Sequence, residues 1–144
     1  MNLYAEIILD HWRNPQNFGQ LRNPDVEAYE FNPLCGDEIR LQLKLKANSQ
    51  KPKARIEQVR FSGNGCAIST AAASMLTEYV KGKKLAELTK LTERDVISLL
   101  GIEIGPQRIK CATLPLIVLK KGVESFLQRV LNGEKIDEDQ NPSR

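Results

Sequence analysis

Polar and apolar side chains alternate strictly over residues 38–46, and this is the clearest pattern in the chain. Successive side chains of a strand point to opposite faces, so the alternation predicts a half-buried strand with one face in water. A polar turn and a second apolar run over residues 54–62 follow, and together they predict an antiparallel hairpin. Ile56, Val59 and Phe61 do not keep one parity, which predicts a bulge or a change of exposed face in the second strand.

Apolar residues at helical spacing occupy most of the remaining sequence. Gly82 and the lysines around it predict the end of a helix that begins at Cys66, and Thr92 is suited to cap the start of another. The last helix is expected to begin near residue 112, with Pro115 in its first turn, where a missing N–H costs little. The predicted helices span residues 2–12, 66–81, 84–90, 92–100 and 112–131, and residues 20–34 are expected to be irregular.

The order of the predicted elements indicates the fold class. Strands come early and helices late, a distribution typical of α+β domains. We therefore expect a small antiparallel sheet covered by helices, with a long C-terminal helix. The chain has 144 residues, the size of one ordinary domain, and its hydrophobic fraction of 41% suits a globular core. Residues 1–131 are expected to form that domain, followed by a polar, frayed tail over residues 132–144.

Charge and hydropathy exclude several classes of protein. The formal net charge of +3 is well below the basic footprint of a dedicated nucleic-acid-binding protein. No apolar run approaches the roughly 20 residues of a membrane-spanning helix, and the acidic residues Glu6 and Asp10 fit neither a signal peptide nor a transit peptide. We expect a cytoplasmic protein, in which the three cysteines are free thiols or metal ligands rather than a disulfide framework.

Each of the three cysteines stands at a junction between predicted elements. Cys35 precedes the first strand, Cys66 lies where the second strand passes into a helix, and Cys111 precedes the last helix. Structural cysteines usually lie inside apolar stripes, whereas functional residues gather on loops and at helix starts. The free N–H groups and partial positive charge of a helix N-terminus favour a thiolate, so we expect thiolate character at Cys66 and Cys111.

The residues next to the cysteines are suited to support a thiolate. Lys110 adds positive charge beside Cys111. Gly36, Gly63 and Gly65 lack a side chain, which lets backbone N–H groups approach a sulfur atom closely. Hydrogen bonds to sulfur also tune the potential of an iron–sulfur site. Gly63 and Gly65 have an ordinary interpretation as well, because such glycines most often form a tight turn from strand to helix.

Asp37 is the natural candidate for a fourth ligand beside the three thiols. It lies two residues after Cys35, so the two side chains point to one side if the segment is extended. A carboxylate is a hard ligand and therefore a weak partner for a soft metal or cluster iron, which suits a carrier that must release its cargo. On spacing alone the alternative stays open, because the cysteines form no CxxC pair and Asp37 alone is more often a strand-start or turn residue. His11 is expected to be a solvated or capping residue rather than a ligand.

Several longer segments match a known family in the family's own order. The matching segments are Leu3-Tyr4, Asp10-His11-Trp12, Asn14-Pro15-Gln16-Asn17-Phe18-Gly19, Asn32-Pro33-Leu34-Cys35-Gly36-Asp37, Phe61-Ser62-Gly63-Asn64-Gly65-Cys66-Ala67-Ile68-Ser69 and Lys110-Cys111-Ala112-Thr113-Leu114. The chain resembles the iron–sulfur cluster assembly scaffolds of the IscU, SufU and NifU N-terminal type over about residues 2 to 126. Each segment alone is a weak signal, whereas the combination is highly specific.

The resemblance implies a SufE/NifU-like α+β domain whose three cysteines and one aspartate converge at one exposed end. It implies that Cys35, Asp37, Cys66 and Cys111 transiently hold a [2Fe–2S] cluster, or Zn²⁺ or Fe²⁺ when no cluster is present. Gly36, Gly65 and Lys110 are then expected to surround the ligands. A cysteine desulfurase is the implied sulfur donor, any of the three thiols is a candidate persulfide acceptor, and carrier or acceptor proteins receive the cluster. The expected oligomeric state is a monomer or a dimer.

The departures from the family pattern bear on the subtype. Lys110 stands where IscU-type members have histidine, as in the SufU type, so a histidine ligand is excluded at that position. SufU members carry an insertion between the second and third cysteines, and the gap in this chain is too short for it. The proline-rich segment that a dedicated DnaK-type chaperone reads is replaced by residues 104–110, which argues against dependence on that chaperone.

Two alternatives to the scaffold function stay open at this stage. A zinc-dependent sulfurtransferase partner of a cysteine desulfurase, as in the SufU type, would use the same four residues. A small structural zinc domain that binds proteins or nucleic acid is the other, and the placement of the cysteines at junctions argues against it. In the scaffold reading the chain is a sulfur acceptor rather than a turnover enzyme.

Overall fold

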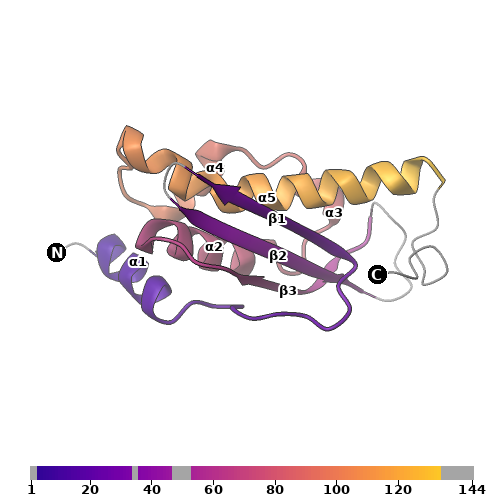
Figure 1. The fold of residues 1–144 in the computed structure, drawn as a ribbon, viewed down its shortest axis with the longest axis horizontal. Helices are drawn as coiled ribbons and strands as arrows, with labels where there is room; N and C mark the ends of the chain where they lie inside the picture. The colour runs from indigo at the N-terminus through magenta and orange to yellow at the C-terminus, as the bar shows by residue number, and fades with distance from the viewer. Residues whose placement is uncertain (1–2, 34–35, 47–52, 134–144) are drawn as a thin grey trace.

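The computed structural model describes residues 3–33, 36–46 and 53–133. Within these residues the chain forms helices and strands in an order that places the sheet before most of the helices (Figure 1). The elements are α1 (Leu3–Arg13), β1 (Val26–Asn32), β2 (Asp37–Leu45), β3 (Ile56–Ser62), α2 (Ala67–Val80), α3 (Leu85–Leu88), α4 (Glu93–Leu100) and α5 (Pro106–Leu131).

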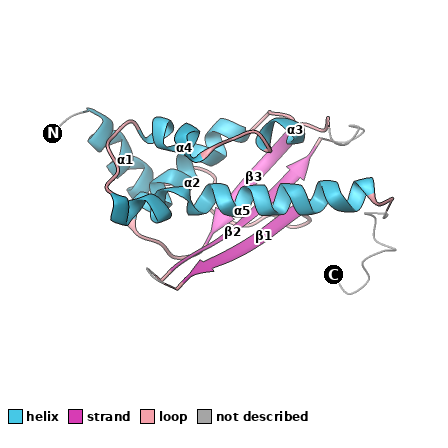
Figure 2. Cartoon of the chain, turned by 90° about the horizontal axis from the view of Figure 1, so that it is seen from above, coloured by secondary structure: helices cyan, strands magenta, loops and turns pink. Residues whose placement is uncertain are grey.

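The three strands form an antiparallel sheet in the order β1-β2-β3, and helices cover one of its faces. Helix α5 runs across β1 and β2, whereas α2 packs against β3, α1 and α5 (Figure 2). Alternate side chains of β2 and β3 point toward these helices and form the core with them. The predicted α+β class, with a small antiparallel sheet and a long C-terminal helix, is confirmed.

The hairpin and the helix starts follow the sequence pattern closely. Leu45 pairs with Ile56 and Lys44 with Gln58, so Glu57 is the extra residue of the predicted bulge. Helix α2 begins directly after Cys66, which is its N-cap. Helix α4 begins after Thr92, whose hydroxyl accepts a hydrogen bond from the backbone N–H of Asp95.

Strand β1 corrects the expectation that residues 20–34 are irregular. Its pattern is inverted, because the aromatic residues Tyr29 and Phe31 point outward while Glu30 points toward α5. Glu30 is accommodated there by Lys121, whose Nζ lies 2.6 Å from the carboxylate. Gly122 of α5 leaves room for the strand, since a Cβ at this position would lie 3.1 Å from the Ala28 side chain. The formation of this strand therefore depends on a contact with α5, which is distant in sequence. The inverted alternation of β1 does not indicate which face is buried.

Helix α5 begins at Pro106 rather than near residue 112, which corrects the second expectation. Gly105 is the N-cap, and Pro106 is the first residue of the helix. The N–H that proline lacks would have no partner within the helix at this position. Pro115 lies in the helix interior and cannot donate the helical hydrogen bond to the carbonyl of Cys111. Cys111 is thus a residue within the helix, and the expectation that it precedes the helix is wrong.

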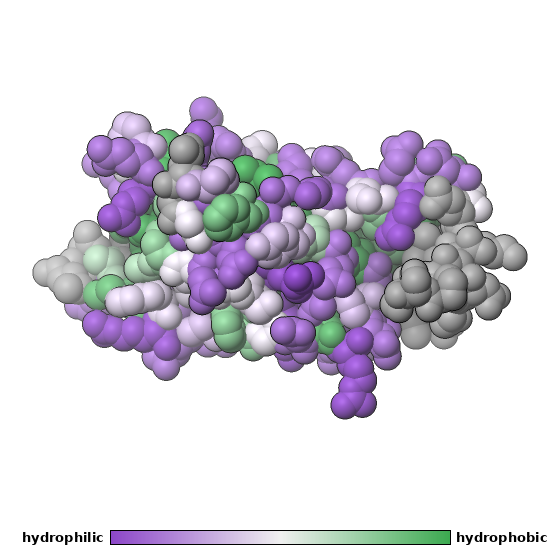
Figure 3. All heavy atoms as spheres, in the orientation of Figure 1, coloured by the Kyte–Doolittle hydropathy of each residue, from purple (hydrophilic) through white to green (hydrophobic). Residues whose placement is uncertain are grey.

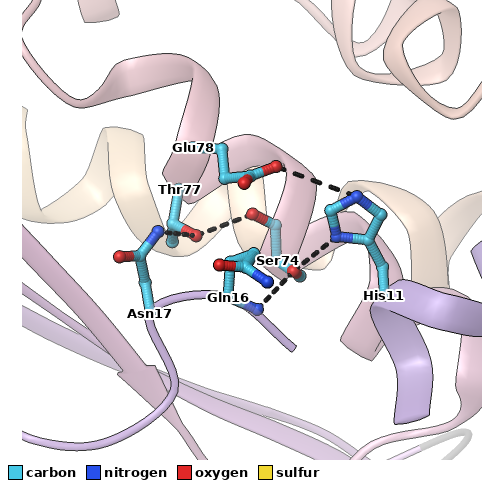
Figure 4. A network of polar contacts seen from close by, with 6 residues as sticks. All are labelled: His11, Gln16, Asn17, Ser74, Thr77 and Glu78. Atoms are coloured by element: carbon cyan, nitrogen blue, oxygen red, sulfur yellow. Dashed lines mark hydrogen bonds and ion pairs between the residues drawn. The ribbon is translucent and has the colours of Figure 1, made fainter. Parts of the chain in front are cut away.

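Polar contacts attach α1 and the segment after it to α2 (Figure 4). His11 Nδ1 lies 2.7 Å from Ser74 Oγ, and the backbone N–H of Gln16 donates to the same oxygen over 2.8 Å. Asn17 Nδ2 donates to Thr77 Oγ1 over 3.1 Å. His11 is in the last turn of α1, as expected of a residue near a helix end, but its side chain is only 15% exposed rather than solvated. Its role is to pack α1 against α2.

The surface over the sheet is mainly hydrophilic with scattered hydrophobic residues (Figure 3). Polar side chains on this face pair between strands. Arg40 on β2 forms an ion pair with Glu27 on β1 at 3.0 Å and lies over the ring of Tyr29. No helix in the described part of the chain is both long enough and apolar enough to cross a membrane. The boundary at residue 131 and the polar tail stay predictions, because residues 134–144 lie outside the described residues.

Candidate metal and thiol site

Three potential metal ligands meet where the start of β2, the start of α2 and the first turns of α5 come together. They are Asp37, Cys66 and Cys111, and one ligand atom from each lies within 4.8 Å of the other two. These residues are far apart in the sequence, so the strand pairing and helix packing bring them together. Three of the four residues that sequence reasoning singled out as ligands are therefore neighbours in the fold.

Cys35 is the fourth of these residues, and it lies outside the described residues. Gly36, which follows Cys35, is placed: its backbone N–H donates to the carbonyl of Asn32 over 2.7 Å, and Asn32 pairs with Asp37. Gly36 has a φ of +79°, a conformation that glycine adopts at little cost. The hydrogen bond from Gly36 to Asn32 joins the residue before β2 to the last residue of β1.

Asp37 begins β2, and its side chain is turned into the protein with only 4% of its surface exposed. Its Oδ1 accepts a hydrogen bond from the backbone N–H of Cys66 over 3.1 Å. Its Oδ2 is buried and has no hydrogen-bond partner among the described residues. A buried carboxylate oxygen without a partner is costly, so this atom is suited to bind a cation.

Cys66 is the N-cap of α2 and is only partly buried. Its Sγ accepts a hydrogen bond from the backbone N–H of Ser69 over 3.4 Å. The Ser69 hydroxyl donates to the Cys66 carbonyl over 3.2 Å, so the side chain of each residue is hydrogen-bonded to the backbone of the other. Sequence reasoning missed this role of Ser69, and its position three residues after an N-cap is the signal that could have revealed it.

Cys111 reaches the site from the side of α5 and is 5% exposed. Because it lies within the helix, the charge at the helix N-terminus, which acts mainly over the first turn, is weaker here than for Cys66. Lys110 is exposed, and successive helical residues do not face each other, so adjacency in sequence alone does not place its charge against the thiol. Cys111 is buried because it lies on the side of α5 that faces the rest of the site.

Two glycines allow the turn from β3 into α2 to pass close to Asp37. A Cβ on Gly63 would collide with the backbone carbonyl of Glu38, and the φ of +123° at Gly63 is also one that other residues rarely adopt. A Cβ on Gly65 would collide with the Ser69 hydroxyl and lie 3.6 Å from Asp37 Oδ1. The glycines therefore act through close packing around Asp37 and Ser69.

The donor set fits a thiophilic cation such as Zn²⁺ or iron. Two sulfur atoms and a carboxylate oxygen converge, and the buried Oδ2 of Asp37 lacks a partner among the described residues. Structural zinc sites usually have four cysteine or histidine ligands, whereas three protein ligands leave a coordination position open. The mixture of soft sulfur and hard oxygen holds such an ion less tightly than four thiolates would.

The fold and this ligand set define a small α+β protein with a thiolate and carboxylate site for a metal or cluster. The model of the NifU-like N-terminal domain matches residues 3–132. The chain therefore belongs to this family, and the resemblance to IscU, SufU and NifU proteins is confirmed.

Curated relatives of both subtypes are similar over most of this chain. The zinc-dependent sulfurtransferase SufU of Bacillus subtilis (strain 168) is 37% identical over 138 residues, covering 84% of this chain and 89% of the relative. The iron–sulfur cluster assembly scaffold protein IscU 1 of Archaeoglobus fulgidus is 32% identical over 136 residues, covering 94% and 84%. A solved structure, that of a candidate SUF-system scaffold from Fervidobacterium islandicum AW-1, superposes with a TM-score of 0.67 at 26% identity, covering 82% of this chain and 94% of that one.

Proposed function

We propose that this protein is an iron–sulfur cluster assembly scaffold, which receives sulfur from a cysteine desulfurase and passes a transient [2Fe–2S] cluster to acceptor proteins. The observation that carries the proposal is that ligand atoms of Asp37, Cys66 and Cys111 converge. One carboxylate oxygen of Asp37, Oδ2, is also buried without a partner among the described residues. Membership of the NifU-like N-terminal family and similarity to IscU-type scaffolds support it. The cluster is the cargo of the protein and not a resident cofactor.

The four proposed ligands are Cys35, Asp37, Cys66 and Cys111. Cys35 completes the set because it lies two residues before Asp37 in the sequence. In the cluster-free form the same residues would hold Zn²⁺ or Fe²⁺. The carboxylate of Asp37 is the hard member of the set, so we expect it to keep the cargo labile. Asp37→Ala is then expected to slow cluster release, and faster transfer from this variant to an apo-ferredoxin would contradict the role.

Sulfur enters by transfer between thiols. A thiolate of the scaffold attacks the outer sulfur of the desulfurase persulfide, a new S–S bond forms, and the desulfurase thiolate leaves. Each of the three thiols is a candidate acceptor. Of the two described thiols, Cys66 is more accessible than Cys111. The electrons for cluster assembly come from an outside reductant, because the sequence contains no flavin or nicotinamide motif.

A zinc-dependent sulfurtransferase is the second candidate function, and two observations favour it. The SufU protein of Bacillus subtilis is 37% identical, and Lys110 replaces the histidine of the IscU type. In this function Zn²⁺ would hold the thiols until a ligand exchanges with the desulfurase. Strong stimulation of desulfurase turnover by the zinc-loaded protein without iron would favour this function over the scaffold.

The proposed role has further parts that rest on family membership. The partners are a cysteine desulfurase and cluster carriers or acceptors. Residues 104–110 replace the proline-rich segment, which argues against dependence on a dedicated DnaK-type chaperone. The similarity to scaffold relatives supports a non-enzymatic role, in which the protein accepts and hands on sulfur without turnover of its own. We further propose a cytoplasmic location and a monomer or dimer.

Anaerobic reconstitution with iron, cysteine and a desulfurase tests the scaffold function. The visible absorption of a cluster is measured for the wild type and for Cys35→Ser, Cys66→Ser and Cys111→Ser. We expect the wild type to develop the absorption and each variant to lose most of it. Glu124→Gln, an exposed position on α5, is the matched control and should behave like the wild type. A wild type that assembles no cluster, or serine variants that assemble it normally, would contradict the proposal.

A further inference from the structure

The loop of residues 63–66 carries Cys66 from the end of β3 to the start of α2. It contains two glycines, which have more conformational freedom than any other residue. Such a loop does not by itself hold a side chain in one place. The neighbouring groups that restrain it therefore matter for the position of the Cys66 thiol.

Glu38 restrains this loop through both its backbone and its side chain. The backbone N–H of Glu38 donates to the carbonyl of Asn64 over 2.8 Å. Its Oε2 accepts a hydrogen bond from Asn64 Nδ2 over 3.1 Å. The carbonyl of Glu38 lies where a Cβ of Gly63 would be, so backbone contact adds to the two hydrogen bonds. Residues 63 and 64 are thus fixed against the start of β2.

Tyr29 fixes the Glu38 side chain in turn. The phenol donates to Glu38 Oε1 over 2.7 Å, so both carboxylate oxygens of Glu38 have a partner. The Tyr29 ring lies under the guanidinium of Arg40, 5.2 Å from its centroid, which holds the ring from the neighbouring strand. We call Tyr29, Glu38 and Asn64 the loop clamp.

Asp37 and Glu38 hold the same loop from opposite faces of β2. Successive strand residues point to opposite sides, so Asp37 faces the buried site while Glu38 faces the open side of the sheet. Asp37 Oδ1 accepts from the N–H of Cys66, two residues beyond Asn64. The distance between the Asp37 carboxylate and the Cys66 thiol therefore depends on where the clamp places the loop.

We propose that Glu38, through Asn64, is a positioning residue that sets the Cys66 thiol at the distance from Asp37 that metal binding requires. The inference rests on the proposed metal role of Asp37 and Cys66, but it concerns residues that are not ligands. The clamp lies on the surface, where polar contacts add little to global stability. Its loss should therefore disturb the site much more than the fold.

Co²⁺ binding to the full chain, reduced and under anaerobic conditions, tests the role of the clamp. Co²⁺ reports thiolate ligation through its charge-transfer absorption. We expect Glu38→Ala and Asn64→Ala to weaken Co²⁺ binding by about tenfold and to lower this absorption, because groups that orient ligands have effects of that size. Glu27→Ala is the matched control, since it removes two contacts on the same sheet face, to Arg40 and Gln42, without touching the loop.

An exchange of donor and acceptor separates positioning from a general loss of structure. Asn64→Asp places a second carboxylate against Glu38 and should weaken Co²⁺ binding. The double variant Glu38→Gln with Asn64→Asp lets the new amide donate to the new carboxylate, and it should recover most of the affinity and the absorption. Wild-type binding in Glu38→Ala and Asn64→Ala, an equal loss in Glu27→Ala, or no recovery in the double variant would overturn the proposal.

Hydrogen exchange of the metal-free chain gives a readout that needs no metal. The backbone N–H of residue 38 donates to Asn64, and that of Cys66 donates to Asp37. Both N–H groups should exchange faster in Glu38→Ala, whereas their exchange rates should be unchanged in Glu27→Ala. Unchanged exchange in Glu38→Ala would overturn the clamp. If the wild type binds no Co²⁺, the proposed metal site fails, and the exchange rates still decide whether the clamp positions the loop.

Discussion

Cys66 and Cys111 reach the same site from two contrasting backbone settings. Cys66 caps a helix at the end of a glycine-containing loop, is partly exposed, and accepts a hydrogen bond from the N–H of Ser69. Cys111 lies inside α5, is buried, and is carried by a continuous helix. The position of Cys66 is set by contacts of the loop with β2 and α2, whereas that of Cys111 is set by the packing of one long helix.

The contrast indicates a division of roles within one ligand set. A ligand on a loop can move during sulfur transfer or release of the cargo, whereas a ligand on a packed helix keeps its place. Substitutions that alter backbone or polar contacts should therefore act mainly on the Cys66 side. The predictions that follow test this difference, beginning with the largest expected effect.

Gly63→Ala should have the largest effect, because it places a Cβ against the carbonyl of Glu38 at a φ of +123°. We expect a loss of about 3 kcal/mol of unfolding free energy and loss of metal binding, measured by urea unfolding and Co²⁺ titration. Gly36→Ala is the control, because Gly36 has a positive φ of +79° and no described residue would lie within 4 Å of an added Cβ, and it should cost about 1–2 kcal/mol. Equal losses in the two variants would show that close packing at Gly63 is unimportant.

The two thiols should differ in their reactivity toward iodoacetamide in the reduced, metal-free chain. Cys66 is partly exposed at a helix start and Cys111 is 5% exposed, so we expect Cys66 to react about tenfold faster or more. Mass spectrometry of the Cys35→Ser variant measures the two rates side by side. Faster alkylation of Cys111 would contradict the contrast between the loop and the helix.

Ser69→Ala should have an intermediate effect on the Cys66 side. Ser69 is fully buried, and its hydroxyl donates to the Cys66 carbonyl, so its removal should cost about 1 kcal/mol and speed the alkylation of Cys66. Thr113→Val on α5 is the matched variant, because within the described part of the chain the Thr113 hydroxyl donates to the carbonyl of Ile109 in its own helix. It should leave the reactivity of Cys66 unchanged. An equal change of that rate in both variants would argue against a local role of Ser69.

The smallest expected effect concerns the titration of Tyr29 at the edge of the loop clamp. The hydrogen bond to Glu38, with burial and the Glu38 charge, raises the pKa of Tyr29 above its ordinary value of 10.0, although Arg40 acts in the opposite direction. The protonated phenol is thus favoured in the folded state, so its stabilising effect is present below the ordinary pKa and is lost as pH rises through the raised pKa.

Ultraviolet absorption of tyrosinate measures this pKa, and Tyr29→Phe identifies which transition belongs to Tyr29. Glu38→Ala should lower the pKa toward the ordinary value, because it removes both the hydrogen bond and the carboxylate charge. Glu27→Gln keeps the contact between Tyr29 and Glu38 and should leave the titration close to that of the wild type. An unchanged pKa in Glu38→Ala would show that Glu38 does not hold the phenol.

Much of the local structure could be predicted from the sequence, because it depends on neighbouring residues. The alternation over residues 38–46, the bulge near Glu57 and the cap at Thr92 each follow from side-chain period or hydrogen bonding within a few residues. Strand β1 could not be predicted in this way, because Glu30 takes an inward position that only Lys121 of α5 makes acceptable. The sequence predicts too late a start for α5, because Pro115 resembles a first-turn proline. Pro106 is the proline that lies at the helix start.

The candidate site shows the same division. Asp37, Cys66 and Cys111 could be chosen from their types, their junction positions and the family resemblance, and the structure brings these three together. Ser69 has one local signal, its position three residues after the N-cap Cys66. Glu38 could not be chosen, because its role depends on which groups lie beside it in three dimensions. Cys35 lies outside the described residues, and its place in the ligand set stays a prediction.

The amino-acid sequence by itself determined the kinds of donor atoms, their order along the chain and the helix that starts at Cys66. These features depend on residue chemistry and on hydrogen bonds between near neighbours. The tertiary structure alone decided that a strand start, a loop and a helix interior meet within 4.8 Å, and that Asp37 keeps a buried oxygen without a partner among the described residues. Such convergence arises from the burial of apolar faces between elements distant in sequence, and no local pattern specifies it.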